Sequence, residues 1–142
     1  MTGSPATRPG SVPVLALGDV LLVTLQGELH DEAAEQLRYD IVHRCASGPA
    51  PVGGVVIDLS GVDMVDSFLG RVLVEIAAST RLLATRTVLA GMRPAVAITL
   101  VELGLTLPGL TTALDVGRAL SLLGHPSPAT PPGQSARPEA GA

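Results

Sequence analysis

Three aspartates and a serine lie close together near the middle of the chain. Asp58, Asp63 and Asp66 fall within nine residues, and Ser67 follows at once. Carboxylates at this density are able to hold a divalent cation or act as a general base, and a serine is able to act as a nucleophile or accept a phosphoryl group. This segment is therefore the first place to look for chemistry.

The residues around this segment do not favour catalysis. His30, His43 and His125 lie elsewhere in the sequence, and no two of them have the spacing of a metal-ligand pair. Ser67 lacks the G-x-S-x-G pattern of a nucleophile elbow, and no glycine-rich nucleotide-binding motif is present. Cys45 falls on the apolar stripe of a predicted helix, as a small core residue does. We expect no metal, no cofactor and no catalytic residue, and so a protein that is not an enzyme.

Composition narrows the choice of partners. The chain has 142 residues and a net charge of −4, with Tyr39 and Phe68 as its only aromatic residues. It offers neither a basic patch nor stacking rings, so nucleic-acid binding is not expected. Hydrophobic residues make up 46% of the chain and charged residues 15%. This balance leaves little polar surface, and we expect faces that are buried by self-association or by a partner.

The sequence also indicates where in the cell the protein is expected. The best candidate for a membrane span, residues 87–107, is interrupted by Arg93, Pro94 and Glu102, and its apolar runs are too short to cross a bilayer. The first ten residues lack the apolar core of a signal peptide. A single cysteine forms no intramolecular disulfide. These features favour a cytoplasmic protein without membrane contact.

The first half of the chain predicts a hairpin and a helix before the aspartate segment. Residues 14–17 and 20–25 are apolar runs on either side of a Gly-Asp turn, which is typical of a β-hairpin. Asp31 is placed to cap a helix that ends near Gly48. Apart from Asp58, residues 55–59 are apolar, which is typical of a strand buried on both faces.

The second half alternates helices and strands. A largely buried helix is predicted from Ser67 to Leu83, at whose N-terminus the free amides and the helix dipole favour an anion. Residues 87–90 predict a strand, and Pro94 is placed as the first residue of a helix that ends before Gly104. A turn is expected at residues 107–109, a minimal edge strand at 110–111, and a last helix over 113–123 with Thr112 as its cap.

Strands that alternate with helices after an opening hairpin predict a single α/β domain. Its sheet is mixed and covered by helices, and the order of its strands is not determined by the pattern. The domain is expected over residues 13–124, between a flexible N-terminal segment of residues 1–12 and a disordered, proline-rich tail of residues 125–142.

Several motifs together resemble the STAS domain, the fold of bacterial anti-sigma factor antagonists. The resemblance covers residues 14–123. The segments that carry it are Val55-Val56-Ile57-Asp58-Leu59, Val65-Asp66-Ser67, residues 88–100, Glu102-Leu103-Gly104 and Thr112-Ala113-Leu114-Asp115. In this family the serine of the Asp-Ser pair is phosphorylated by a partner-switching kinase, which corresponds to Ser67.

The residues after Ser67 indicate a subtype. Antagonists that bind anti-sigma kinases directly carry a small residue and then glycine after the serine, whereas Phe68-Leu69-Gly70 resembles the RsbS-type scaffold of the stressosome. The resemblance implies a serine/threonine switch kinase, related STAS scaffold proteins and further copies of the chain as partners. The partner surface is expected to include Asp63, Asp66, Phe68, Leu69 and Arg71.

Two other interpretations remain open. One is a direct antagonist that captures an anti-sigma factor and so frees a sigma factor. The other is a small-ligand sensor or a minor enzyme on the same fold, which would need a polar pocket. Thr87 and Thr99 are further hydroxyls that a kinase could modify, but each falls inside a predicted strand or helix and is expected to be structural.

Overall fold

The computed structural model describes residues 12–104 and 110–124 of the chain. In this part the chain forms one five-stranded sheet in the order β1-β2-β3-β4-β5 and four helices. In chain order the elements are β1 (Val14–Leu17), β2 (Val20–Gln26), α1 (Asp31–Ser47), β3 (Gly54–Gly61), α2 (Ser67–Leu82), β4 (Arg86–Ala90), α3 (Pro94–Glu102), β5 (Leu110–Ala113) and α4 (Val116–Leu122). The predicted α/β architecture is confirmed.

The sheet is mixed because only its first pair of strands is antiparallel. β1 and β2 form the predicted hairpin around Gly18, which has a φ of 63°. The pairs β2–β3, β3–β4 and β4–β5 are all parallel, with Val23, Ile57 and Leu89 in register across the three central strands. The carboxyl ends of these parallel strands therefore meet at one edge, where the loops to α1, α2 and α3 begin.

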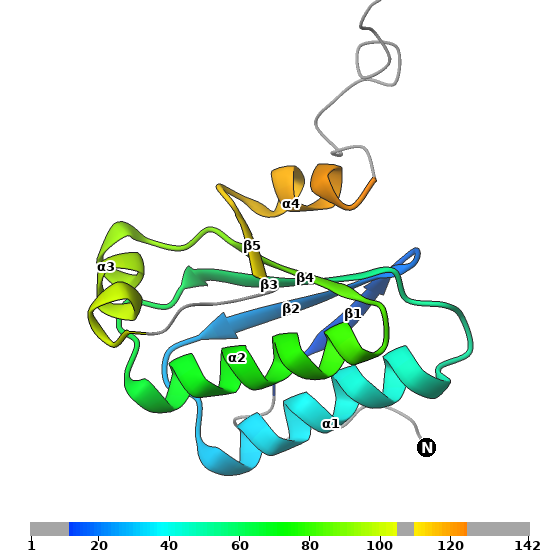
Figure 1. Cartoon of the computed structure of the whole chain (residues 1–142), viewed down its shortest axis with the longest axis horizontal. Coiled ribbons are helices and arrows are strands. Elements are labelled where there is room, and N and C mark those ends of the chain that lie inside the picture. The colour runs from blue at the N-terminus through cyan, green and yellow to red at the C-terminus, as the bar shows by residue number, and fades with distance from the viewer. Residues whose placement is uncertain (1–11, 105–109, 125–142) are drawn as a thin grey trace, which may run out of the picture.

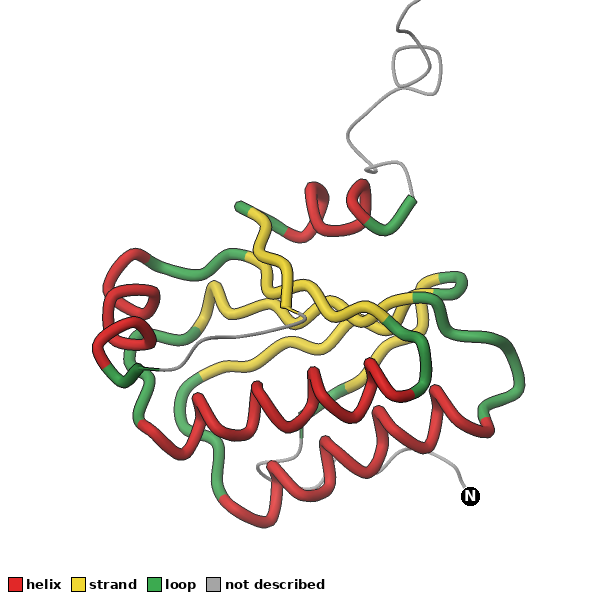
Figure 2. Tube along the Cα trace, in the orientation of Figure 1, coloured by secondary structure: helices red, strands yellow, loops and turns green. Residues whose placement is uncertain are grey.

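One face of the sheet carries a thick layer. Figures 1 and 2 show α1 and α2 side by side along this face. The strands contribute alternate residues to this layer, as a pleated strand must, and the helices contribute residues such as Leu37, Ile41, Leu73 and Ile76. All four of these side chains are fully buried. This layer is the main core, and it fixes the orientation of α2.

A buried hydroxyl pair joins α2 to the sheet within this layer. Thr80 Oγ1 and Thr87 Oγ1 lie 2.8 Å apart, and the Thr80 hydroxyl also donates to carbonyl oxygens of its own helix. Both threonines are almost fully buried, so Thr87 is structural, as expected from the sequence. Thr99 is half-buried and donates to the Ala95 carbonyl oxygen within α3.

The opposite face is covered by α4, which packs mainly against β3, β4 and β5 (Figure 1). Its Ala119 and Leu120 meet alternate residues of the strands in a smaller cluster. At the end of α4 the Leu123 side chain fills the space above Gly54, where a Cβ would lie 2.6 Å from a Leu123 methyl carbon. A larger residue at position 54 would require the Leu123 side chain to move.

Two predicted helix caps were wrong. Asp31 is the first residue of α1 and His30 is its N-cap, without a side-chain capping bond; Asp31 instead lies in the first turn, where the helix dipole favours a carboxylate. Thr112 does not cap the last helix either. It pairs with Leu89 in the parallel ladder, so β5 runs on to Ala113, and Asp115 caps α4 through a 2.8 Å bond from the Arg118 amide.

Other boundaries match the sequence. α1 ends at Ser47 before Gly48, α2 begins at Ser67, and Pro94 is the first residue of α3. The predicted flexible segment of residues 1–12, the tail of residues 125–142 and the turn at residues 107–109 lie outside the described residues, apart from residue 12.

Candidate functional site

Ser67 is the first residue of α2 and is exposed to solvent. The preceding Asp66 is the N-cap in extended conformation, and its Oδ1 accepts a 2.9 Å hydrogen bond from the Leu69 amide. Asp66 therefore satisfies one of the free amides of the first turn and fixes the point where the helix begins. The Ser67 hydroxyl consequently lies on a defined surface position rather than on a loose loop.

The next residues anchor this position in the core. Phe68 is partly buried and packs against the main cluster, whereas Leu69 is only 5% exposed and belongs to that cluster. Leu69 is therefore unable to present its side chain to a partner, and this part of the predicted partner surface is corrected. Arg71 is exposed, and it lies one helical turn after Ser67 on the same side of α2.

Arg93, at the start of α3, contacts the loop between β3 and α2. Arg93, the N-cap residue of α3, donates through Nε to the Ser60 carbonyl oxygen at 3.1 Å and pairs through Nη1 with Asp63 Oδ1 at 3.1 Å. Gly91 passes close by with a φ of 70°, and a Cβ there would lie 3.1 Å from the Ser60 Cβ. Only glycine fits this approach without strain.

A groove of about 660 Å³ lies between the β2–α1 loop and the β3–α2 loop, and Asp66 and Phe68, on either side of Ser67 in the sequence, line it. Its acidic lining residues are Glu28, Asp31, Asp63 and Asp66, and no lysine or arginine lines it. Met64, on the same loop as Asp63, is 83% exposed. The sequence did not predict Met64 as an exposed residue. Its apolar neighbours Val62 and Val65 are buried, and the sequence pattern does not show which of the three side chains faces solvent.

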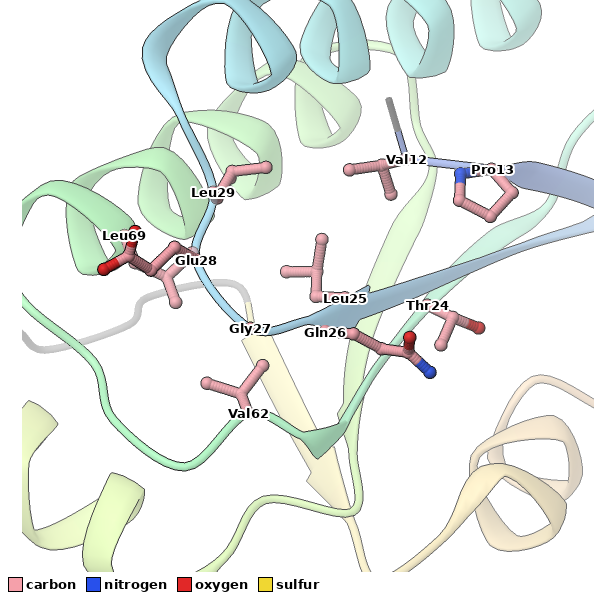
Figure 3. A pocket seen from close by; sticks show the side chains of 10 residues that line it. All are labelled: Val12, Pro13, Thr24, Leu25, Gln26, Gly27, Glu28, Leu29, Val62 and Leu69. Carbon is pink, nitrogen blue, oxygen red and sulfur yellow. The ribbon is translucent and has the colours of Figure 1, made fainter. Parts of the chain in front are cut away.

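A smaller hollow of about 240 Å³ adjoins this groove. Figure 3 shows Val12, Leu25, Leu29 and Val62 gathered around it, whereas the Thr24 and Gln26 side chains project on the other side of β2. The lining of the hollow therefore combines apolar side chains with polar ones such as Glu28.

The three aspartates serve separate structural purposes. Asp58 accepts a 3.0 Å hydrogen bond from the Ser60 amide, Asp63 pairs with Arg93, and Asp66 caps α2. In residues 12–104 and 110–124 no group of three or more His, Cys, Asp or Glu side chains is arranged to hold a metal ion. The structure therefore accounts for each carboxylate without a ligand.

Partial burial raises the pKa of the Cys45 thiol and outweighs the opposing hydrogen bond with Thr85, which disfavours the reactive thiolate. It packs against the main core, as predicted.

None of the helices in the described part of the chain is long and apolar enough to cross a membrane.

Comparison with known proteins identifies the fold family. The STAS domain model matches residues 11–119, which is most of the chain. The chain belongs to the STAS domain family. The predicted resemblance to this family is confirmed.

Solved structures of RsbS and of a stressosome chain are similar to this chain in sequence and in fold. A serine-to-glutamate variant of RsbS from Moorella thermoacetica is 39% identical, with a TM-score of 0.70, over 80% of this chain and 94% of that one. A chain of a structure described as the molecular architecture of the stressosome, a signal integration and transduction hub, is 42% identical, with a TM-score of 0.69, over 79% of this chain and 96% of that one. STAS proteins of the stressosome type are thus its relatives.

Longer STAS proteins match over part of their length. The RsbT co-antagonist protein RsbRD of Bacillus subtilis is 28% identical over 78% of this chain and 40% of that protein. The chain therefore spans about two fifths of the length of this relative.

Proposed function

We propose that this STAS protein is a phosphorylation-regulated scaffold that sequesters a serine/threonine switch kinase and releases it when Ser67 is phosphorylated. On this proposal it acts in the cytoplasm, as a component of a stressosome-like assembly with related STAS proteins, and it controls a sigma-factor stress response. It works as a substrate and a binding platform, with no active site of its own.

The observation that carries the proposal is the exposed Ser67 hydroxyl at the N-terminus of α2. A phosphoryl group there adds about −1.5 to −2 charges at pH 7. The helix dipole and the free amides of the first turn stabilise an anion at this end, typically by about 0.3–1 kcal/mol. Arg71 lies one turn further along the same side and adds a cation. The fold therefore tolerates the modification.

A bound partner does not share this tolerance. The residues on either side of Ser67, Asp66 and Phe68, line a groove with acidic residues, and Met64 adds exposed apolar surface there. A protein docked over Met64 and Phe68 would have to desolvate the new dianion in an already negative neighbourhood. Each tenfold loss of affinity needs only about 1.4 kcal/mol, so one buried like-charge contact is enough for release without refolding.

The proposed partner surface consists of Asp63, Met64, Asp66, Phe68 and Arg71. It contains both apolar and charged side chains, as protein interfaces do. Leu69 is left out because it is buried. Met64 takes its place as the apolar contact with the largest exposure in this loop.

Two experiments test the proposal. Incubation with ATP and a serine/threonine switch kinase of the stressosome type, followed by mass spectrometry, is expected to place the phosphoryl group on Ser67. In pull-downs with that kinase we expect Ser67→Ala to retain it and Ser67→Asp to lose it. Ser121→Asp is the matched control, because Ser121 is exposed on α4 in the other layer and should leave retention unchanged.

Equal retention by wild type, Ser67→Ala and Ser67→Asp would overturn the release mechanism. The size of the complex separates the scaffold from a direct antagonist. A scaffold mixed with its STAS relatives should elute as a very large assembly, whereas an antagonist should form a small complex with its anti-sigma kinase.

A further inference from the structure

A further cavity, of about 450 Å³, lies at the end of the domain away from Ser67. It is bounded by the β1–β2 hairpin, the last turns of α1 and the connector of residues 49–52. Figure 1 shows these segments at the opposite end of the molecule from the start of α2. Its volume is within the range of about 300–1,000 Å³ that is typical of small-molecule sites. The proposed switch at Ser67 makes no use of this cavity.

Much of the lining of this cavity is apolar. Leu21 is fully buried in the main core, and Val52 packs against the same core. Ala16 lines the cavity from β1, where it is opposite Leu21 and so on the same face of the sheet. Pro49 and Pro51 add rings that fix their own backbone angles and carry no amide donor. These residues offer a surface for an apolar group.

The connector that forms one wall is held at both sides. Thr85 Oγ1 donates to the Val52 carbonyl oxygen at 3.2 Å, from the segment before β4. The Gly53 amide donates to the Asp19 carbonyl oxygen in the hairpin turn at 2.7 Å. The connector is therefore tied to the hairpin and to the sheet, and the cavity exists without a ligand to shape it.

Arg44 gives the cavity its charge. It lies in the last turn of α1, is half-buried and lines the cavity, whereas no acidic side chain does. The two ion pairs within residues 12–104 and 110–124 involve other arginines. Asp40, one turn earlier on α1, accepts a hydrogen bond from Gln36, and the Asp19 carboxylate lies against Gly53. The guanidinium of Arg44 thus keeps its charge for a ligand.

His43 adds a fixed ring beside Arg44. Its ring stacks on that of Tyr39, with centroids 5.6 Å apart and an angle of 11° between the planes. Its Nδ1 lies 3.4 Å from Ser47 Oγ, and both His43 and Ser47 line the cavity. These contacts hold the imidazole in one orientation, so this polar side of the cavity is preformed as well.

We propose that the cavity binds a small organic acid, with an acyl or aryl body against Leu21 and Val52 and its carboxylate on Arg44. A guanidinium presents two parallel N–H donors that match a carboxylate. The groove at the other end of the domain is lined by acidic residues without a lysine or arginine, and the chain carries a net charge of −4. An anion is therefore directed to this cavity and away from the groove.

The proposed ligand and the proposed partner contact the two ends of one helix. Asp31 at the start of α1 lines the acidic groove, and Ser47 at its end lines the cavity. The binding site itself does not depend on the phosphorylation of Ser67. The variant Ser67→Asp should bind the acid as the wild type does, so the failure of one proposal does not decide the other.

Amide NMR spectra of the isotope-labelled full chain, titrated with octanoate below its micelle concentration, test the proposal. We expect saturable shifts at residues that line the cavity, among them Ala16, Gly18, Ser47 and Val52. The neutral 1-octanol and the cationic octylamine carry the same apolar body. Both should bind at least about tenfold more weakly, because they lose the charged hydrogen bonds with Arg44. Inorganic phosphate alone should bind more weakly still, because it has no apolar part.

A change of charge tests the role of Arg44. Arg44→Gln keeps the length of the side chain and should weaken octanoate binding by about tenfold, with an unchanged circular dichroism spectrum. Arg38→Gln is the matched control on the same helix. Arg38 pairs with Glu35 and does not line the cavity, so its replacement should leave the affinity unchanged.

A change of volume tests the location without altering charge. Ala16→Phe places a ring in the cavity and should abolish octanoate binding. Leu15→Phe is its control, because alternate residues of a strand point to opposite faces of the sheet. Leu15 is opposite Leu22, on the α4 side, and Leu15→Phe should bind as the wild type does.

Four results would overturn the proposal. The first is the absence of saturable shifts with octanoate. The second is 1-octanol or phosphate binding as tightly as octanoate. The third is unchanged affinity in both Arg44→Gln and Ala16→Phe. The fourth is a set of shifts centred on the acidic groove around Asp63 and Asp66, which would place the ligand at the other end of the domain.

Discussion

The two faces of the sheet differ in how deeply they are buried. The α1–α2 face joins all the central strands to two long helices, whereas the other face has one short helix and leaves β1 uncovered. The thick side holds α2, and so holds Ser67, in a fixed position. The thin side has unused apolar surface. The comparison indicates that stability rests mainly on one face, and that the other face keeps exposed apolar side chains.

Truncating a core leucine on each side should give the largest difference. Leu73 is fully buried on the thick side, and Leu73→Ala should lower the free energy of unfolding by about 3 kcal/mol, since the packed helices are unable to close the cavity. Leu120→Ala on the thin side should cost about 2 kcal/mol, because α4 is free to settle inward. Urea denaturation measures both. Equal losses would remove the distinction between the faces.

The hydroxyl pair between Thr80 and Thr87 should have the next largest effect. Thr80→Val keeps the shape but leaves the buried Thr87 hydroxyl without this partner, which should cost about 1–2 kcal/mol. The double variant Thr80→Val, Thr87→Val should cost less than the sum of the single variants, because no unpaired hydroxyl remains. Thr99→Val, on the half-exposed α3, is the control. Simple additivity would mean that the pair does not couple α2 to β4.

The N-caps of α2 and α4, Asp66 and Asp115, allow the stability of the two faces to be compared. Asp66→Ala should lower the free energy of unfolding by about 1 kcal/mol, because α2 is part of the main core, and Asp66→Asn should retain most of it. Asp115→Ala removes a similar bond from α4. We expect its effect as faster hydrogen exchange of the α4 amides. Global destabilisation by Asp115→Ala, without local exchange, would show that α4 does not open separately.

The ion pair between Asp63 and Arg93 should have the smallest effect on stability. Both side chains are mostly exposed, so Asp63→Asn should change the free energy of unfolding by no more than about 0.5 kcal/mol. The difference should shrink further at high salt. A loss comparable to that of Asp66→Ala would mean that the loop before Ser67 depends on this pair more than on the buried Val62 and Val65.

The elements could be predicted where local sequence determines them. The Gly-Asp turn fixed the hairpin, and Pro94 fixed the start of α3 because a proline needs no amide donor there. The boundary between β5 and α4 could not be predicted in this way. Thr112 is an acceptable cap on local grounds, and only pairing with β4 shows that it continues a strand. Strand order was likewise undetermined, because it depends on contacts between distant segments.

The candidate site was predicted in part. Asp66 and Ser67 follow from the Asp-Ser pattern at a helix start, and the structure places both on the surface. The contact of Arg93 with the Ser60–Asp63 segment joins residues some thirty positions apart, and sequence spacing carries no sign of it. Leu69 and Met64 are both apolar, and only the three-dimensional packing shows that one is inside and the other outside.

The reversed direction of β1 has a practical consequence for labelling. Val12 borders the hollow that also touches Leu69, whereas α4 ends beside Gly54, at the opposite edge of the sheet. A fluorophore or affinity handle attached at residue 12 would therefore join the domain beside the loops that carry the proposed partner surface. The same handle attached behind residue 124 would start from the remote edge, where it is better suited to report on binding.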